Sequence, residues 1–411
     1  IYGIEQWSDL FNARQKLALI CLAQLVREAD NTELQDLFGI AIDRIADRGT
    51  SACRWDSSPT SEVVKNTFSR QALGMVWDYV EVNPLSGATG DWAGALDWVC
   101  RVAEHCAGLN VKPGEVSHGT ATRLPHPDGY FHAVVTDPPY YDSVPYSHLA
   151  DFFYVWLKRV IGDLYPEVFR TPLTPKGPEI VQDRPHSLST SVKDANFYEH
   201  EMTQAFSEAA RVLHPDGTFA VVFAHKSTAA WETLVDSLLS AGLVVTASWP
   251  LHTEMATRVR AMETASLASS IFLVCRKRTE AEEGYFNDVR RELEARIRER
   301  LDFFWEQGIR GADFFISAIG PAVEVFGRYT AVRRLSGEEV TVGRFLDLVQ
   351  EIVADYALAR ILTPSQPSPH VGEGSVGHLD PPTRFYVLWR WAYGANRVHF
   401  DDARKLAQAQ G

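Results

Sequence analysis

The chain has 411 residues and a mass of 46.0 kDa, which is too long for one small module and allows two or three domains. Hydrophobic residues make up 45% and charged residues 23%, which excludes disorder, collagen and coiled coil as descriptions of the whole chain. Forty Lys and Arg residues against 53 Asp and Glu residues give a net charge of −13. This charge repels polyanions, so any nucleic-acid contact must be local.

Cysteine usage and the start of the chain bear on the compartment. The five cysteines include no Cys-x-x-Cys pair, so the sequence indicates neither a disulfide framework nor a zinc ribbon. No apolar run approaches the roughly 20 residues of a membrane helix, and the first residues do not form a signal peptide. We therefore expect a cytoplasmic protein without metal and without membrane contact. Because the first residue is not Met, we also expect the carboxyl-terminal part of a longer polypeptide.

Residues 1–112 predict a helical region. Apolar residues recur at helical spacing from Leu10 to Leu25 and again from Phe38 to Ile45. The segments 56–59 and 83–87 have the composition of turns. Residues 87–91, which contain two glycines, follow a proline turn rather than a strand, so we interpret them as a plain loop. This region contains no catalytic pattern.

Residues 113–278 alternate between strand and helix patterns and predict an α/β sheet. Strands are expected at 115–118, 131–136, 218–223, 243–249 and 270–275, and helices at 147–160, 197–212 and 229–239. A proline-rich stretch at 166–185 predicts a long loop, and residues 214–217 predict a turn. Strands and helices that alternate at these lengths indicate a doubly wound, Rossmann-like fold.

The remainder of the chain is expected to be helical and then partly flexible. Residues 279–362 predict a helical region, in which the mixed charges of 288–300 suit a solvated helix face. Residues 363–382 are rich in Pro, Gly and Ser and predict a flexible linker. An aromatic-rich tail follows at 383–411.

The sharpest signal is the tetrapeptide Asp-Pro-Pro-Tyr at 137–140, directly after the strand predicted at 131–136. In an open α/β sheet, ligands bind at the carboxyl ends of the strands, so the motif lies where chemistry is done. We expect the catalytic residues to be Asp137, Pro138, Pro139 and Tyr140. The alternative for this tetrapeptide is a structural turn in an enzyme of another kind.

These residue types suit chemistry on an aromatic amine, such as the exocyclic amino group of adenine or cytosine. The lone pair of such an amine is delocalised into the ring, so a catalyst must localise it and direct it at an electrophilic methyl group. The Asp137 side chain and the Pro138 carbonyl can each accept one N–H, which leaves the lone pair directed the remaining way. Two successive prolines stiffen the turn, and Tyr140 can stack on the base. A base in a duplex must be flipped out to reach such a site.

The motif and its surroundings resemble a known family. Asp-Pro-Pro-Tyr is the signature of amino-methyltransferases that use S-adenosylmethionine. The wider stretches 134–146 and 149–157 resemble the adenine-specific DNA methylases that carry a DUF1156 domain and a zinc ribbon, and so do the segments 7–15, 68–73 and 308–322. The resemblance therefore extends over nearly the whole chain.

The resemblance implies a cofactor, a substrate and a missing part. It implies methyl transfer from S-adenosylmethionine to a base in DNA, most of all adenine, as in restriction-type modification or phage defence. The family places its glycine-rich cofactor loop, its zinc-binding cysteines and a central strand upstream of residue 1. We therefore expect an incomplete sheet with an apolar edge beside Val134, completed by the amino-terminal part of the protein or by another chain. The isolated chain should bind the cofactor poorly.

Weaker candidates each have a structural alternative. Thr120 and Ala121 stand where such enzymes carry a cofactor-contacting turn, although Thr120 replaces the usual acid; an ordinary strand exit is equally plausible. Tyr141, Asp142 and Tyr146 can line the base pocket, or the tyrosines can pack on the helix near 147. His225 and Lys226 can touch substrate or phosphate, or cap the next helix. The aromatic residues Phe152, Phe153 and Trp156 indicate core rather than a stacking platform.

Two other functions stay open from the sequence. An RNA guanine amino-methyltransferase shares the same tetrapeptide. A non-enzymatic subunit for nucleic-acid recognition or assembly is the alternative from another class, because the cofactor loop is absent from this chain.

Overall fold

A computed structural model describes residues 3–58, 62–69, 72–142, 144–182, 193–225, 228–252, 269–278, 282–362, 379–393 and 400–409. It is a mixed α/β protein whose chain divides into two compact units. Unit 1 comprises Ile1–Ser117 and Val144–Glu179, and unit 2 comprises His118–Ser143 and Ile180–Gly411. Within the described residues, no helix has both the length and the apolar composition needed to cross a membrane.

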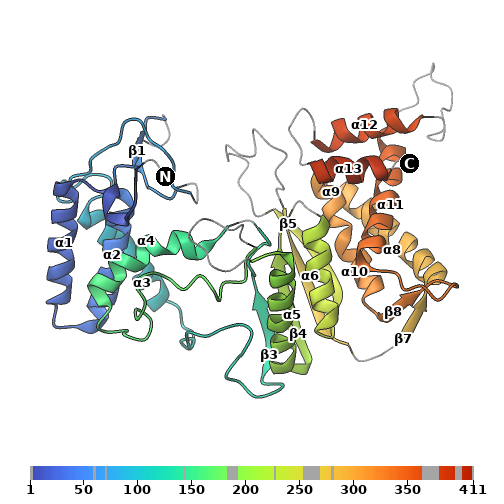
Figure 1. Cartoon of the computed structure of the whole chain (residues 1–411), viewed down its shortest axis with the longest axis horizontal. Coiled ribbons are helices and arrows are strands. Elements are labelled where there is room, and N and C mark those ends of the chain that lie inside the picture. Colours follow the sequence, from blue (N-terminus) through green and yellow to red (C-terminus); the bar gives the residue numbers. More distant parts are fainter. Residues whose placement is uncertain are drawn as a thin grey trace. The chain divides into compact units, whose positions relative to one another are not determined.

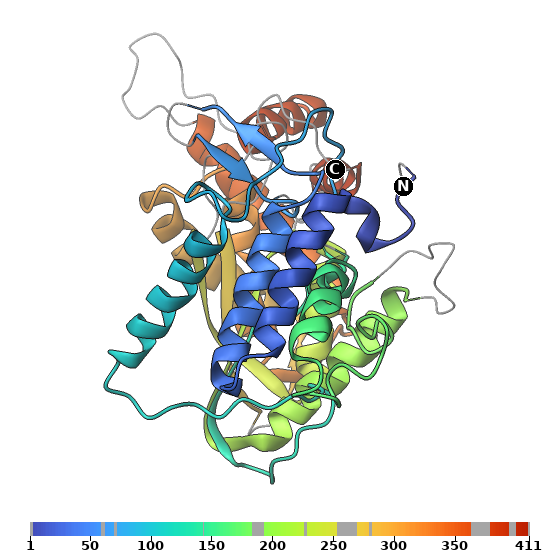
Figure 2. The same ribbon diagram turned by 90° about the vertical axis from the view of Figure 1, so that its left-hand side faces the viewer.

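Unit 1 is a helical assembly that extends beyond the helical region expected at 1–112, because the helix expected within the α/β region at 113–278 belongs to this unit. Its helices are α1 (Ala13–Arg27), α2 (Thr32–Arg48), α3 (Trp92–Ala107) and α4 (Tyr146–Ile161), preceded by the 3-10 turn η1 (Trp7–Leu10). Asn12 begins α1 by accepting a hydrogen bond from the backbone N–H of Gln15. Helices α1 and α2 lie side by side (Figure 2). Two short strands, β1 (Arg54–Asp56) and β2 (Val63–Lys65), form an antiparallel pair.

The core of unit 1 is built around Phe152 of α4, which is fully buried. Its ring stacks on Phe11 at 5.9 Å and meets Phe68 edge-on at 5.1 Å. Trp156 is also buried and contacts Phe11 at 5.5 Å. The prediction that this aromatic run forms core is confirmed.

Unit 2 contains a four-stranded mixed sheet in the order β3-β4-β6-β5. The elements that build it are β3 (Phe131–Thr136), α5 (Ala195–Val212), β4 (Leu213–Phe223), α6 (Thr228–Ser240), β5 (Leu243–His252) and β6 (Ser269–Lys277). Strands β3 and β4 are parallel, and β6 is antiparallel to both β4 and β5. Consequently β3, β4 and β5 point the same way, and their carboxyl ends form one rim of the sheet.

Alternation along the strands gives the sheet two unlike faces. On the first face Phe219, Val221 and Phe223 of β4 are fully buried, and α5 and α6 lie on that side (Figure 1). On the second face Val135 of β3 is 72% exposed, beside half-buried Ala220 of β4. In the described sheet β3 is the end strand and pairs only with β4.

The carboxyl-terminal helices share the core of unit 2. They are α8 (Phe286–Glu306), α9 (Ala312–Ser317), α10 (Ile319–Phe326), α11 (Val342–Leu362), α12 (Pro381–Tyr393) and α13 (Phe400–Gln408). Helix α10 approaches β5 very closely, because a Cβ atom at Gly320 would lie 2.0 Å from Ser248. Only glycine fits there without movement of the backbone.

Three details differ from the sequence-based prediction. The strand predicted at 115–118 is wrong: the segment has no strand partner in the described residues, and Val116 is 99% exposed. The turn at 214–217 lies inside β4 as a bulge, since Leu213 pairs with Phe131 and Thr218 with Ala133. The predicted helical region after 279 also contains a parallel pair, β7 (Glu282–Tyr285) with β8 (Tyr329–Arg333). The linker residues 363–378 lie outside the described residues.

Asp43 on α2 is half-buried, and one oxygen of its carboxyl group is shielded from solvent. Its Oδ1 atom has no hydrogen-bond partner among the described residues. Burial, together with the nearby Asp47 carboxylate, raises the pKa of Asp43 to about 8. Asp43 therefore stays protonated in the folded chain at neutral pH.

We predict that Asp43→Asn stabilises the chain at neutral pH. The unfolded Asp43 ionises near pH 3.8, so its ionisation destabilises the fold progressively as the pH rises from about 4 to 8. Removing this group raises the free energy of unfolding at pH 7 by about 2–4 kcal/mol and changes little near pH 4. Urea denaturation at several pH values measures the difference. The exposed Glu104→Gln is the control, and an Asp43→Asn effect independent of pH would contradict the prediction.

Candidate functional site

The Asp-Pro-Pro-Tyr motif begins at the carboxyl end of β3. The last residue of the strand, Thr136, pairs with Val221 of β4, and Asp137 follows directly. Asp137 is exposed, whereas Pro138 is buried. Within the described residues the Asp137 carboxylate has no hydrogen-bond or ion-pair partner. An acceptor group thus stands free at the rim where open α/β sheets bind ligands.

The turn after Asp137 is held through carbonyl groups, because prolines have no N–H to donate. The Pro139 carbonyl accepts two hydrogen bonds, from the Tyr198 hydroxyl at 2.7 Å and from the Tyr141 N–H at 3.0 Å. The Tyr141 carbonyl in turn accepts the N–H of Gln182 at 2.9 Å. The Pro138 carbonyl is not among the acceptors of these bonds. The turn is therefore fixed without using the two acceptors predicted to hold an amine.

Tyr141 has a strained backbone. Its φ of 54° lies in the left-handed region, which costs a residue with a side chain about 1 kcal/mol or more. Its ring packs edge-on against Tyr198 at 5.2 Å and His225 at 5.8 Å. Burial is the main cause that raises the pKa of the Tyr141 hydroxyl, with the Asp142 carboxylate adding to it. Packing from two elements thus maintains a conformation that the local chain disfavours.

Residues at the ends of β3 and β4 meet beside the motif. Asp142 Oδ1 lies 3.1 Å from Nε2 of His225, whose side chain is mostly buried. The His225 carbonyl accepts the indole N–H of Trp231 on α6 at 2.9 Å. The Tyr140 ring contacts Phe223 edge-on at 5.4 Å. The structure therefore brings together four of the predicted site residues: Tyr140, Tyr141, Asp142 and His225.

The other predicted residues are not brought to this cluster. Thr120 and Ala121 are exposed, and the Thr120 hydroxyl bonds to that of Thr122 at 2.9 Å. Tyr146 is the first residue of α4 and belongs to unit 1. Lys226 lies outside the described residues.

The segment after Thr120 is anchored at the opposite end of the sheet. The Leu124 N–H donates to Glu208 at 2.7 Å, and its carbonyl accepts from Arg211 at 3.1 Å. Arg211 lies at the end of α5, next to the amino end of β4, and its guanidinium holds the pKa of Glu208 at about 2. The chain therefore enters β3 near the amino ends of the strands, at the end of the sheet opposite to Asp137.

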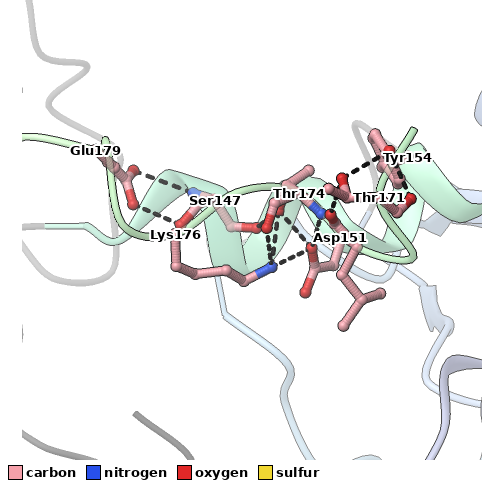
Figure 3. A network of polar contacts seen from close by, with 8 residues as sticks. Ser147, Asp151, Tyr154, Thr171, Thr174, Lys176 and Glu179 are labelled. Atoms are coloured by element: carbon pink, nitrogen blue, oxygen red, sulfur yellow. Dashed lines mark hydrogen bonds and ion pairs between the residues drawn. The ribbon is translucent and has the colours of Figure 1, made fainter. Parts of the chain in front are cut away.

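The proline-rich stretch predicted as a long loop is a loop in its described part, residues 166–182. Its residues up to Glu179 belong to unit 1, where they are fixed to α4 (Figure 3). Asp151 of α4 is 5% exposed. Its carboxylate accepts hydrogen bonds from Thr174 and forms an ion pair with Lys176. The Ser147 N–H donates to Glu179 at 3.0 Å. These bonds use the polar groups of the loop for anchoring. Residues 183–185 lie outside the described residues.

Two residues that hold the turn were not expected from the sequence. Tyr198 occurs at helical spacing with buried Met202 and Phe206, so its pattern indicates only core. A buried tyrosine needs a hydrogen-bond partner for its hydroxyl, and this requirement could have indicated a polar contact at Tyr198. Gln182 acts through its backbone N–H, which carries no sequence signal.

In the described part of the chain, the residues expected to bind S-adenosylmethionine do not converge on one site. Asp137 lies at the open carboxyl rim, whereas the segment that contains Thr120 and Ala121 is anchored toward the amino end of the sheet. The loop at 87–91 belongs to unit 1, where Asp91 accepts the Gly94 N–H at 2.8 Å and begins α3. This loop caps the amino end of α3. No group of three His, Cys, Asp or Glu residues able to hold a metal occurs in the described part of the chain.

Comparison of the chain with protein-family models, with curated proteins and with solved structures finds no match. The resemblance to adenine-specific methylases therefore stays a prediction that rests on the residues themselves.

We predict that Tyr198→Phe loosens the turn after Asp137. Loss of one buried hydrogen bond to the Pro139 carbonyl should lower the free energy of unfolding by about 1 kcal/mol. It should also increase the hydrogen-exchange rates of the Tyr141 and Gln182 amides selectively, since both bonds belong to the same turn. Exchange measured by NMR or mass spectrometry tests this. Tyr285→Phe, at an exposed position, is the control, and equal protection in both variants would contradict the role of Tyr198.

Proposed function

We propose that the chain is part of an amino-methyltransferase that modifies the exocyclic amino group of a nucleic-acid base, with adenine in DNA as the first candidate. The fold supports this proposal through its order of elements. Strands β3, β4 and β5 are linked by α5 and α6 and end at a common rim. We propose that this sheet is the incomplete Rossmann-like sheet expected from the sequence.

The observation that carries the proposal is the Asp137 carboxylate, which has no partner among the described residues and lies beside a rigid turn. An amine that donates one N–H to Asp137 and the other to the Pro138 carbonyl has its remaining lone pair directed away from both acceptors. Acceptors that are already fixed lose little entropy when the amine binds, so the gain is one of positioning. The hydrogen bonds from Tyr198 and Tyr141 to Pro139 provide that fixation.

The site requires completion from outside the described residues. The methyl donor implied by the resemblance is S-adenosylmethionine, and the residues expected to bind it do not converge in the described part of the chain. The free edge of β3 and exposed Val135 are suited to another strand, which would extend the sheet beside Asp137. We propose that the amino-terminal portion of the same protein, or another chain, supplies this strand and the remaining wall of the cofactor site.

The partner in this proposal is DNA with the target base flipped out or unpaired, since an amino group inside a duplex cannot reach Asp137. The net charge of −13 argues that such contact is local. RNA guanine is the alternative substrate, because the same acceptors suit its amino group.

A non-enzymatic recognition subunit is the second candidate. It is favoured by one observation: the residues expected to bind the cofactor do not converge on Asp137. Such a subunit would bind nucleic acid and leave it unmodified.

We predict that Asp137→Ala lowers methyl transfer by at least about 10³-fold, because a methyl group cannot accept the N–H of the amine. Asp137→Asn should lower it less, because the amide oxygen still accepts a hydrogen bond but carries no charge. Transfer of labelled methyl groups to DNA is measured with the complete gene product, together with circular dichroism to verify folding. Asp216→Asn, an exposed carboxylate in the bulge of β4, is the matched control. Activity retained in Asp137→Ala removes this residue from the mechanism.

We further predict that the modified base is N6-methyladenine. Digestion of treated DNA and RNA to nucleosides, followed by mass spectrometry, identifies the product directly. Methylated cytosine or guanine would redirect the proposal to that base. Absence of any methylated nucleoside from the complete gene product, despite nucleic-acid binding, would favour the recognition subunit.

A further inference from the structure

A second feature at the same rim of unit 2 is a cavity at the carboxyl end of β5. Its volume is about 520 Å³, within the range of small-ligand sites. Trp249 and Leu251 of β5 form one wall, and α8 contributes Arg296, Arg300 and Phe303 to the other. Trp249 is 59% exposed and Phe303 is 46% exposed, so aromatic side chains face solvent on both sides.

The strand register relates this cavity to Asp137. Thr136 pairs with Val221, Val221 with Leu273, and Leu273 with Ser248. Asp137 and Trp249 are the next residues along their strands, so they stand at the same level of the rim. They occupy opposite edges of the sheet, three strand spacings or about 14 Å apart.

The residues between these two positions are apolar. Val222 of β4 pairs with Phe272 of β6, which pairs with Trp249. Val222 and Phe272 are both half-buried. By register they lie on the same face of the sheet as Val135 and Trp249, between the motif and the cavity.

The charges of the cavity are unevenly neutralised. Arg296 is paired with Glu299 at 2.9 Å and with Glu324 at 3.2 Å. The Arg300 guanidinium instead lies over Phe303 at 5.0 Å from the ring centroid, and no carboxylate within the described residues forms an ion pair with it. Arg300 is therefore a positioned cation with its charge available to an anion.

Exposed aromatic rings beside an available guanidinium define a ligand chemistry. A flat heterocycle stacks on Trp or Phe, with about 1–3 kcal/mol per base, and a phosphate pairs with the guanidinium. A nucleoside phosphate unit combines both groups. A purely apolar ligand would form no ion pair with Arg300, and an inorganic anion would not stack on the aromatic rings.

We propose that this cavity is a nucleotide subsite in which Trp249 and Phe303 stack on a base and Arg300 binds its phosphate. The unit comes from the single strand that flanks the base presented to Asp137, so this assignment rests on the proposed function. A local subsite of this kind is compatible with the net charge of −13. A free nucleotide carries the same base and phosphate, and the competition experiment below distinguishes it from a nucleic-acid strand.

The test measures binding of a fluorescein-labelled single-stranded DNA 12-mer to the complete gene product by fluorescence anisotropy. Trp249→Ala and Arg300→Gln are each expected to weaken binding at least about tenfold, and Trp249→Phe to restore most of the affinity because it retains a stacking ring. Arg298→Gln, an exposed arginine of the same helix, and Trp77→Ala in unit 1 are the matched controls.

Salt dependence separates the two roles. Arg300→Gln should reduce the slope of log affinity against log salt by about 0.7, the value for one phosphate contact to a single strand. Trp249→Ala should weaken binding and leave this slope unchanged. Unchanged affinity in both variants, or affinity lost equally in the controls, overturns the subsite.

Competition with AMP distinguishes the two sources of the nucleotide. A 12-mer that binds at least about 100-fold more tightly than AMP supports a polynucleotide strand, whereas equal affinities overturn the strand assignment in favour of a free nucleotide. Methyl transfer is assayed in parallel. Trp249-dependent binding without methylation by the complete gene product would refute the proposed function alone, whereas methylation that is insensitive to Trp249 and Arg300, in KM as well as kcat, would refute the subsite alone.

Discussion

The Asp-Pro-Pro-Tyr turn depends on a constraint set by its own prolines. Two successive prolines have no N–H and cannot donate backbone hydrogen bonds. The turn is therefore held by the hydrogen bonds that the Pro139 carbonyl accepts. One of the two donors, the Tyr198 hydroxyl, comes from a fully buried side chain of α5. The position of Asp137 is therefore coupled to the packing of α5 on β4. The hydrophobic core thus holds the turn from behind, while the Asp137 carboxylate has no partner among the described residues.

The sheet of unit 2 is asymmetric in a way that suits this arrangement. Its first face is buried under α5 and α6, whereas its second face is half-open around Val135, Val222 and Phe272. The motif therefore has a packed hydrophobic core on one side and a partly exposed face of the sheet on the other. Asp137 and Trp249 lie at the same level on opposite edges of the sheet, and the proposed single-stranded partner would extend from one to the other.

Local patterns in the sequence predicted most elements of the sheet and its helices. The helices around Phe152 and Phe206 and the strand before Asp137 follow from apolar periodicity and turn residues. The strand expected near Val116 failed because a strand also needs a neighbour, which periodicity does not reveal. The parallel pair β7–β8 was missed for a related reason, since its partners are over 40 residues apart and both strands are short.

The site was predictable only where it is local. The motif and its neighbours Tyr141 and Asp142 are contiguous in sequence, and His225 follows another strand of the same sheet, so topology placed it near them. The Tyr198 hydroxyl and the β5 cavity depend on contacts across the chain. Trp249 and Phe303, for example, are separated by more than 50 residues and meet only through the packing of α8.

The contact between Gly320 and Ser248 has an implication for how this protein can vary. The backbone of α10 approaches β5 so closely that one small residue on each side fills the available space. Glu324 lies one helical turn after Gly320 and reaches the β5 cavity, so the separation of α10 from β5 also determines the depth of that cavity. Among relatives, we expect a larger side chain at one of these two positions to be accompanied by a smaller side chain at the other. A larger residue at either one would alter which ligands the neighbouring cavity admits.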